Sequence, residues 1–69
     1  MDLKQLQYFV VSVESGSFKK AADILYTTQP HISKSIKALE TELDVQILER
    51  KARGVEVTEA GKKIYEYAC

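Results

Sequence analysis

The apolar positions of residues 17–43 follow the period of an α-helix twice, with a short break between the two series. The first series has the spacing i, i+3, i+4 and i+7 and comprises Phe18, Ala21, Ala22 and Leu25. The second has the spacing i, i+4, i+7 and i+11 and comprises Ile32, Ile36, Leu39 and Leu43. Residues 26–28 form the corner between the two predicted helices. The pattern therefore predicts two amphipathic helices joined by a tight corner.

Polar residues stand where each of these helices begins. Ser17 precedes the first helix and Thr28 the second, and a hydroxyl at either place can accept an unpaired backbone N–H. Pro30 falls in the first turn of the second helix, where its missing N–H costs nothing. Ala21 and Ala22 are small enough for two helices to cross closely. An ordinary helical pair in a small bundle would show the same pattern, so the corner alone does not define the fold.

The segment before this pair predicts a third helix. Asp2 and Gln5 have the spacing of a capping box, and Gly16 is a natural left-handed residue to end the helix after Ser15. Apolar residues recur between them at helical intervals, at Leu3, Leu6, Val10 and Val13. The adjacent Tyr8 and Phe9 are both expected in the core.

The segment after the pair predicts a hairpin and the beginning of a fourth helix. Asp44 is expected to end the second helix of the pair in the left-handed region, and residues 46–57 read as strand, turn and strand with Lys51–Gly54 as the turn. Three cations would then surround the tip. Thr58 is placed to cap a last helix with an apolar stripe formed by Ala60, Ile64, Tyr67 and Ala68.

Length and composition indicate one small domain. The chain has 69 residues, 45% of them hydrophobic, and no apolar run approaches the ~20 residues that span a bilayer. We expect neither a membrane segment nor an export signal. The only cysteine is Cys69, so an internal disulfide is excluded and a reducing cytoplasm is the expected setting.

The charges sum to zero but are unevenly distributed along the chain. Residues 27–39 carry Lys34 and Lys37 without any acid, and residues 50–55 carry Arg50, Lys51 and Arg53 without any acid. These two stretches favour a polyanionic partner on one face of the domain, although an ordinary solvated surface would also accommodate such charges.

Three helices followed by a two-stranded hairpin define a mainly α fold, the winged helix-turn-helix. Almost the whole chain resembles the N-terminal DNA-binding domain of a LysR-type transcriptional regulator. The matching positions are Leu6 to Phe9, Gly16-Ser17-Phe18, Ala21-Ala22, Leu25, Thr28-Gln29-Pro30, Ser33, Ile36, Leu39-Glu40, Leu43, Leu48-Glu49-Arg50, Arg53-Gly54 and Thr58-Glu59-Ala60-Gly61. The chain departs from the family pattern at Thr27, His31, Asp44 and Ile47-Leu48.

The resemblance implies a division of the chain and a set of partners. Residues 1–58 would form the DNA-binding domain, with the helix-turn-helix at about 18–37 and the wing at about 46–57, and residues 59–69 would begin a linker helix. Operator DNA would be the partner of this domain. The full-length protein would pair as a homodimer, or a larger oligomer, through the linker helix and would bind a small-molecule effector through a C-terminal domain absent from this sequence.

The resemblance also assigns the candidate DNA-binding residues: Thr28, Gln29, Pro30, His31, Ser33, Lys34, Lys37, Arg50, Lys51 and Arg53. A glutamine amide can pair with adenine at two points, whereas lysines and hydroxyls chiefly bind phosphates. Three assignments stay open at this stage. Thr28 is a cap or a phosphate contact, Lys37 binds phosphate or solvent, and His31 contacts DNA or lies on plain surface.

Two other classes of function were considered. Catalysis has little support, because the chain has a single histidine, a single terminal cysteine and no acid pair distinct from ordinary helix surface. No metal or cofactor is expected. A winged helix that binds protein in place of DNA remains the alternative, and the two acid-free basic stretches argue against it.

Overall fold

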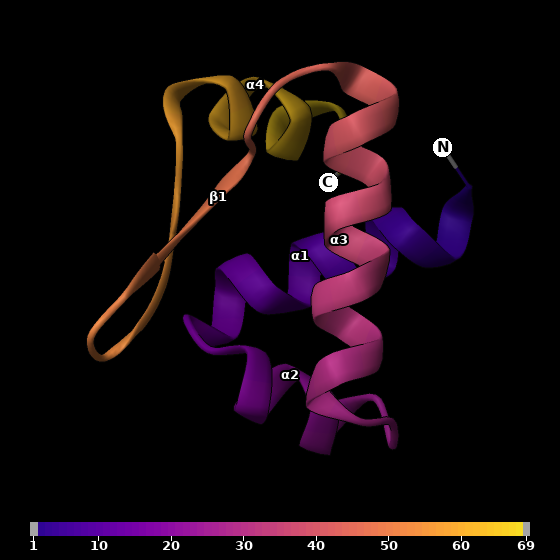
Figure 1. Ribbon diagram of the computed structural model, residues 1–69, viewed down its shortest axis with the longest axis vertical. Helices are drawn as coiled ribbons and strands as arrows, with labels where there is room; N and C mark the ends of the chain where they lie inside the picture. Colours follow the sequence, from indigo (N-terminus) through magenta and orange to yellow (C-terminus); the bar gives the residue numbers. More distant parts are fainter. Residues whose placement is uncertain (1, 69) are drawn as a thin grey trace.

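The computed structural model describes residues 2–68 and has the predicted order of elements (Figure 1). Its helices and strands are α1 (Leu3–Ser15), α2 (Phe18–Ile24), α3 (Gln29–Leu43), β1 (Leu48–Lys51), β2 (Gly54–Val57) and α4 (Glu59–Ala68). The mainly helical winged helix-turn-helix prediction is confirmed. Cys69, on which the expectation about disulfides rests, lies outside the described residues.

Side-chain caps begin the helices where the sequence predicts them. The Asp2 carboxylate accepts a hydrogen bond from the Gln5 amide at 2.8 Å, and the Gln5 side chain accepts one from the Asp2 amide at 3.1 Å. The Ser17 hydroxyl accepts from the Lys20 amide, and the Thr28 hydroxyl accepts from the His31 amide, each at 3.2 Å. These bonds satisfy amides that have no partner within their own helix.

Left-handed residues end α1 and α3, as predicted. Gly16 has φ 72° and Asp44 has φ 55°. Tyr26, in the corner between α2 and α3, also has a positive φ of 55°, which the sequence does not suggest because tyrosine rarely adopts this conformation. The corner therefore reverses the chain within the few residues that separate the two helices.

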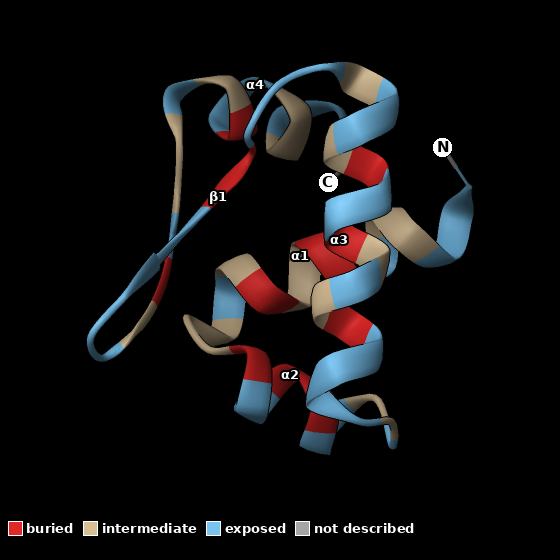
Figure 2. Ribbon diagram, in the orientation of Figure 1, coloured by how far each residue is buried: buried red, intermediate tan, exposed pale blue. Residues whose placement is uncertain are grey.

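The core lies where α1, α2 and α3 meet, and the hairpin beside them adds Leu48 and Val55 to it (Figure 2). Phe9 of α1, Ala21 of α2 and Ile32 of α3 are each completely buried. Tyr8 and Phe9 are both buried, as expected. The predicted stripe of α1 is wrong in part, because Leu3 is 84% exposed and the buried face of the helix centres on Phe9 and Ser12.

The first strand of the hairpin begins later than the sequence suggests. β1 begins at Leu48, two residues after the predicted start of the wing, and only Ala52 and Arg53 separate the strands. The strands are antiparallel, and Arg50 stands opposite Val55. The predicted turn at Lys51–Gly54 is confirmed: Ala52 and Arg53 are its central residues, and Lys51 and Gly54 close it as the last rung of the ladder.

Backbone and carboxylate contacts fix the base of the wing to α3 and to the corner after α1. One Glu40 carboxylate oxygen accepts hydrogen bonds from the amides of Ile47, at 2.8 Å, and Leu48, at 3.2 Å. On the other strand, the Val55 amide donates to the Gly16 carbonyl at 3.0 Å. The wing is therefore attached to the helices along both strands.

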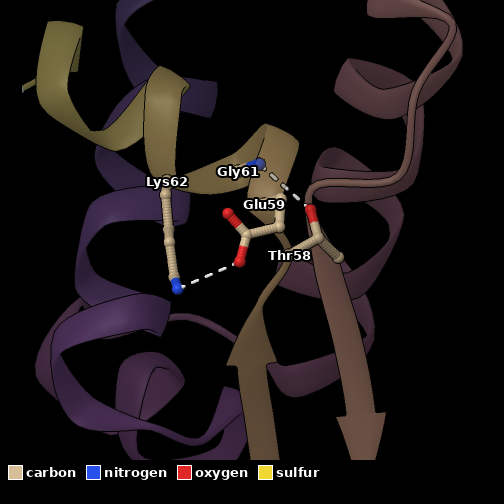
Figure 3. A network of polar contacts seen from close by, with 4 residues as sticks. All are labelled: Thr58, Glu59, Gly61 and Lys62. Atoms are coloured by element: carbon tan, nitrogen blue, oxygen red, sulfur yellow. Dashed lines mark hydrogen bonds and ion pairs between the residues drawn. The ribbon is translucent and has the colours of Figure 1, made fainter.

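A local network starts α4 (Figure 3). The Thr58 hydroxyl accepts from the Gly61 amide at 3.0 Å and donates to the Gln46 carbonyl at 2.6 Å, and Lys62 pairs with Glu59 at 3.3 Å. α4 packs on α1 and β2, with Gly61 buried. Within the predicted apolar stripe, the Tyr67 side chain is 90% exposed. Among residues 2–68, no helix is both long enough and apolar enough to cross a bilayer.

Candidate nucleic-acid interface

One face of α3 is turned toward the wing and the start of α2. Gln29, Ser33 and Lys37 follow one another at i, i+4 and i+8, so they share this face. Gln29 lines a cavity of about 170 Å³ with Phe18 and Arg50, while Ser33 and Lys37 line a neighbouring cavity of about 340 Å³ that also includes Arg50. The two cavities are neighbours that share Phe18 and Arg50 in their linings, and we refer to them together as the groove.

Arg50 projects from the inner face of the wing toward the helices. Side chains alternate between the two faces of a strand, so Arg50 lies on the same face as the buried Leu48. Its guanidinium lies over the Phe18 ring, 5.1 Å from the centroid, and one nitrogen lies 3.4 Å from the Ser33 hydroxyl. The structure thus brings together two basic segments that are well separated in the sequence.

Lys51 lies in the last rung of the wing, on the face opposite to that of Arg50. Its ammonium pairs with the Glu49 carboxylate at 3.5 Å, and Glu56 stands directly opposite Glu49 in the ladder. The outer face therefore carries two acids and one base. Of the three cations expected around the tip, Arg53 lies in the turn and Lys51 in the rung that closes it, whereas the Arg50 side chain is directed toward the helices.

The first turn of α3 presents an exposed surface. Thr28, Gln29, Pro30 and His31 are all exposed, and the Thr28 hydroxyl forms the predicted cap. The His31 ring makes an edge-to-face contact with Tyr8, with centroids 5.5 Å apart. His31 is therefore oriented by α1 as well as by its position in α3. Lys34 is exposed one turn further on.

Lys19 is a neighbour of this surface that the sequence analysis missed. It is exposed at the start of α2 and lines the same cavity as Gln29 and Arg50. Its place in the sequence gives no signal, because the proximity of α2 to the wing depends on how the hairpin docks. A pair of lysines in the first turn of a helix reads as an ordinary solvated surface.

The acid closest to the groove is engaged by the backbone. Glu40 lines the larger cavity, and its carboxylate binds the amides of Ile47 and Leu48. In the part of the chain that the structure describes, no three histidine, cysteine, aspartate or glutamate residues are grouped in a way that could hold a metal ion. The groove thus combines cations, an amide and hydroxyls on one face of the domain.

Comparison with known proteins identifies the family. A family model described as "Bacterial regulatory helix-turn-helix protein, lysR family" matches residues 3–62. The chain belongs to this family. The departures at Thr27, His31, Asp44 and Ile47-Leu48 therefore occur within an otherwise matching domain.

Curated relatives and solved structures agree with this assignment. The chain is 50% identical to the HTH-type transcriptional regulator BenM of Acinetobacter baylyi and 47% identical to the nitrogen assimilation regulatory protein nac of Klebsiella aerogenes. Each match covers 99% of this chain and 22% of the relative, so the chain spans about a fifth of the length of these proteins.

Two similar structures contain DNA. The CbnR DNA-binding domain in its DNA complex matches with a TM-score of 0.95 and 43% identity, over 99% of this chain and 78% of that chain. The BenM DNA-binding domain in complex with the catB site 1 DNA matches with a TM-score of 0.94 and 50% identity, over 99% of this chain and 76% of that chain. The fold is therefore that of a DNA-binding domain of this family.

Proposed function

We propose that this chain is the operator-reading domain of a bacterial transcriptional regulator and binds double-stranded DNA in a sequence-specific manner. α3 would enter the major groove, and the wing would lie on the adjacent backbone or minor groove. The observation that carries the proposal is the contact between Arg50 and Ser33, which joins the two acid-free basic segments into one surface. The DNA complexes of similar domains support this function over a protein-interaction module.

The exposed side chains would contact different parts of the DNA. Gln29 would pair with adenine at two points, which is worth ~1–3 kcal/mol of discrimination. Lys34, Lys37 and Thr28 would bind phosphates and set the register, and Arg53 would reach the minor groove from the tip of the wing. Pro30 would contact the DNA with its ring. His31, held by its contact with Tyr8, would contact the DNA with the part of its ring that Tyr8 leaves exposed. Lys51 would contribute less, because Glu49 already neutralises it.

The salt dependence of DNA binding tests whether the exposed face of α3, and not another part of the surface, binds the phosphates. Replacing Lys34 and Lys37 together by glutamine should reduce the slope of log K against log salt by about 0.9 for each phosphate that is no longer neutralised. Lys62 and Lys63 of α4 provide a matched control, since their replacement changes the net charge equally but leaves α3 unaltered. Equal slopes for both double variants, measured by fluorescence anisotropy on duplex DNA, would contradict the proposed face.

The whole protein would act as a homodimer, or a larger oligomer, through the helix that begins after Thr58. An apolar surface supports this assembly, because the exposed Leu3 and Tyr67 and the half-buried Leu6 and Val10 line a hollow of about 540 Å³ between α1 and α4. A small-molecule effector would bind a further domain, and the protein would be cytoplasmic and without catalytic activity. The relatives are transcriptional regulators, which supports a role other than catalysis.

Sedimentation over a concentration series tests the assembly. The 69-residue chain should be monomeric or weakly dimeric, because α4 offers little surface beyond what already covers α1, and a stable interface buries at least ~1,200 Å². Extending the chain until the helical pattern ends should restore a dimer with a symmetric footprint. A tight dimer of the unextended chain would show that another face carries the contact.

A further inference from the structure

The Arg50 guanidinium lies at the point where the wing, α2 and α3 converge. Its carbon is 5.1 Å from the centroid of the Phe18 ring, within the ~6 Å range of a cation–π contact. Its Nη2 atom is 3.4 Å from the Ser33 hydroxyl oxygen. Phe18 is only 8% exposed and belongs to the core cluster, so the ring offers a fixed platform. Arg50 therefore holds a defined position beside the face of α3 that carries Gln29 and Ser33.

The chemistry of the two groups fixes the direction of this hydrogen bond. A guanidinium has N–H donors and no acceptor, so the Ser33 oxygen must accept. The hydroxyl proton of Ser33 then remains free to be donated elsewhere. Thr41 of the same helix provides a contrast, because its hydroxyl donates to the Lys37 carbonyl at 3.0 Å and its proton is used within the helix.

We propose, on the basis of the function proposed above, that Arg50 is a positioning residue that makes Ser33 a hydrogen-bond donor to a base edge in the major groove. The acceptors of matching chemistry are N7 of a purine, O6 of guanine and O4 of thymine. The cytosine amino group offers a donor at the corresponding place and is rejected. Arg50 thus contributes to sequence discrimination through Ser33, beyond any charge that it offers to phosphate.

The spacing along α3 predicts where this base lies. Ser33 follows Gln29 by four residues, which is about 6 Å along the helix axis. Successive base pairs are about 3.4 Å apart. The base that Ser33 contacts therefore lies one or two pairs from the base that Gln29 contacts.

A base-by-base affinity profile tests this inference. A site is first selected from random duplexes by the wild-type protein, and all four base pairs are then compared at each position for wild type, Ser33→Ala and Arg50→Lys. Ser33→Ala should lower discrimination roughly twofold to tenfold at one position near that of Gln29. Arg50→Lys should lower it at the same position while leaving the salt slope unchanged, because the charge is retained.

The double variant and a control complete the test. Arg50→Lys combined with Ser33→Ala should lose no more discrimination than Ser33→Ala alone, since both changes remove one interaction. Lys63→Gln removes an exposed cation from α4, which does not line the groove, and should leave the profile unchanged.

Two results would overturn the inference. The first is an Arg50→Lys variant that binds every duplex more weakly by the same factor, and the second is a Ser33→Ala profile without any changed position. A wild-type protein that selects no site at all would instead overturn the proposed function.

Discussion

Gly54 packs so closely on Gly16 that a Cβ atom on Gly54 would lie 2.1 Å from the Gly16 carbonyl oxygen. The same carbonyl accepts the hydrogen bond of the Val55 amide, so the second strand of the wing lies directly against the corner between α1 and α2. Gly54 also has φ 146°, a region that side chains rarely permit. Glycine is needed here both for space and for backbone conformation.

Gly54→Ala should therefore displace the wing and lower the free energy of unfolding by about 1–3 kcal/mol. DNA affinity should fall as well, because Arg50 would lose its place beside Ser33. Gly16→Ala is the matched control, since Gly16 has φ 72° but open space around its Cβ position. Denaturant unfolding of both variants tests this prediction. A decrease in the free energy of unfolding for Gly54→Ala that is no greater than that for Gly16→Ala would show that the wing accommodates the Cβ atom without destabilising the domain.

Ser12→Ala should stabilise the domain by about 1 kcal/mol. The Ser12 side chain is completely buried, and within residues 2–68 its hydroxyl has no hydrogen-bond partner. Alanine removes this unsatisfied group and favours the helix. Ser12→Thr should instead destabilise, because the added methyl group enters a filled core. A lower denaturant midpoint for Ser12→Ala would indicate that the hydroxyl makes a contact in solution.

Asp44→Gly should stabilise the domain by up to about 1 kcal/mol without altering DNA affinity. Asp44 is confirmed as the left-handed residue that ends α3, and its carboxylate stands at the negative end of the helix dipole. Asp44→Asn separates the two causes, since asparagine removes the charge but retains a side chain at positive φ. A midpoint that stays constant or falls for the glycine variant would mean that the carboxylate makes a favourable local contact.

The local elements could be predicted from the sequence, since they depend on neighbours in the chain. The caps at Ser17 and Thr28 and the terminators at Gly16 and Asp44 all act within one helical turn, and each is confirmed. The core of the helix pair followed from apolar spacing for the same reason. The apolar spacing predicted the buried face of α1 less well, because this helix has apolar residues on two faces and the spacing does not show which of them packs on the other helices.

The arrangement of the candidate site could be predicted only in part. The acid-free basic stretches pointed to α3 and the wing, but the sequence does not show which face of the wing meets the helices. Strand alternation places Arg50 on the face of Leu48 and Lys51 on the other face, and only the docking of the hairpin makes the first of these the inner face. Lys19 joins the groove only through tertiary packing, so no local signal could assign it.

In the proposed function, α3 reads bases through Gln29, and the surrounding cations supply affinity. The most direct measurement is the ratio of affinities for the selected site and for random duplex, determined at several salt concentrations for wild type, Gln29→Ala and Lys34→Ala. Gln29→Ala should lower this ratio by a factor that corresponds to ~1–3 kcal/mol of binding free energy, and it should leave the affinity for random duplex nearly unchanged. Lys34→Ala should weaken both affinities and reduce the salt slope by about 0.9. Equal losses on specific and random duplex for Gln29→Ala would contradict the account.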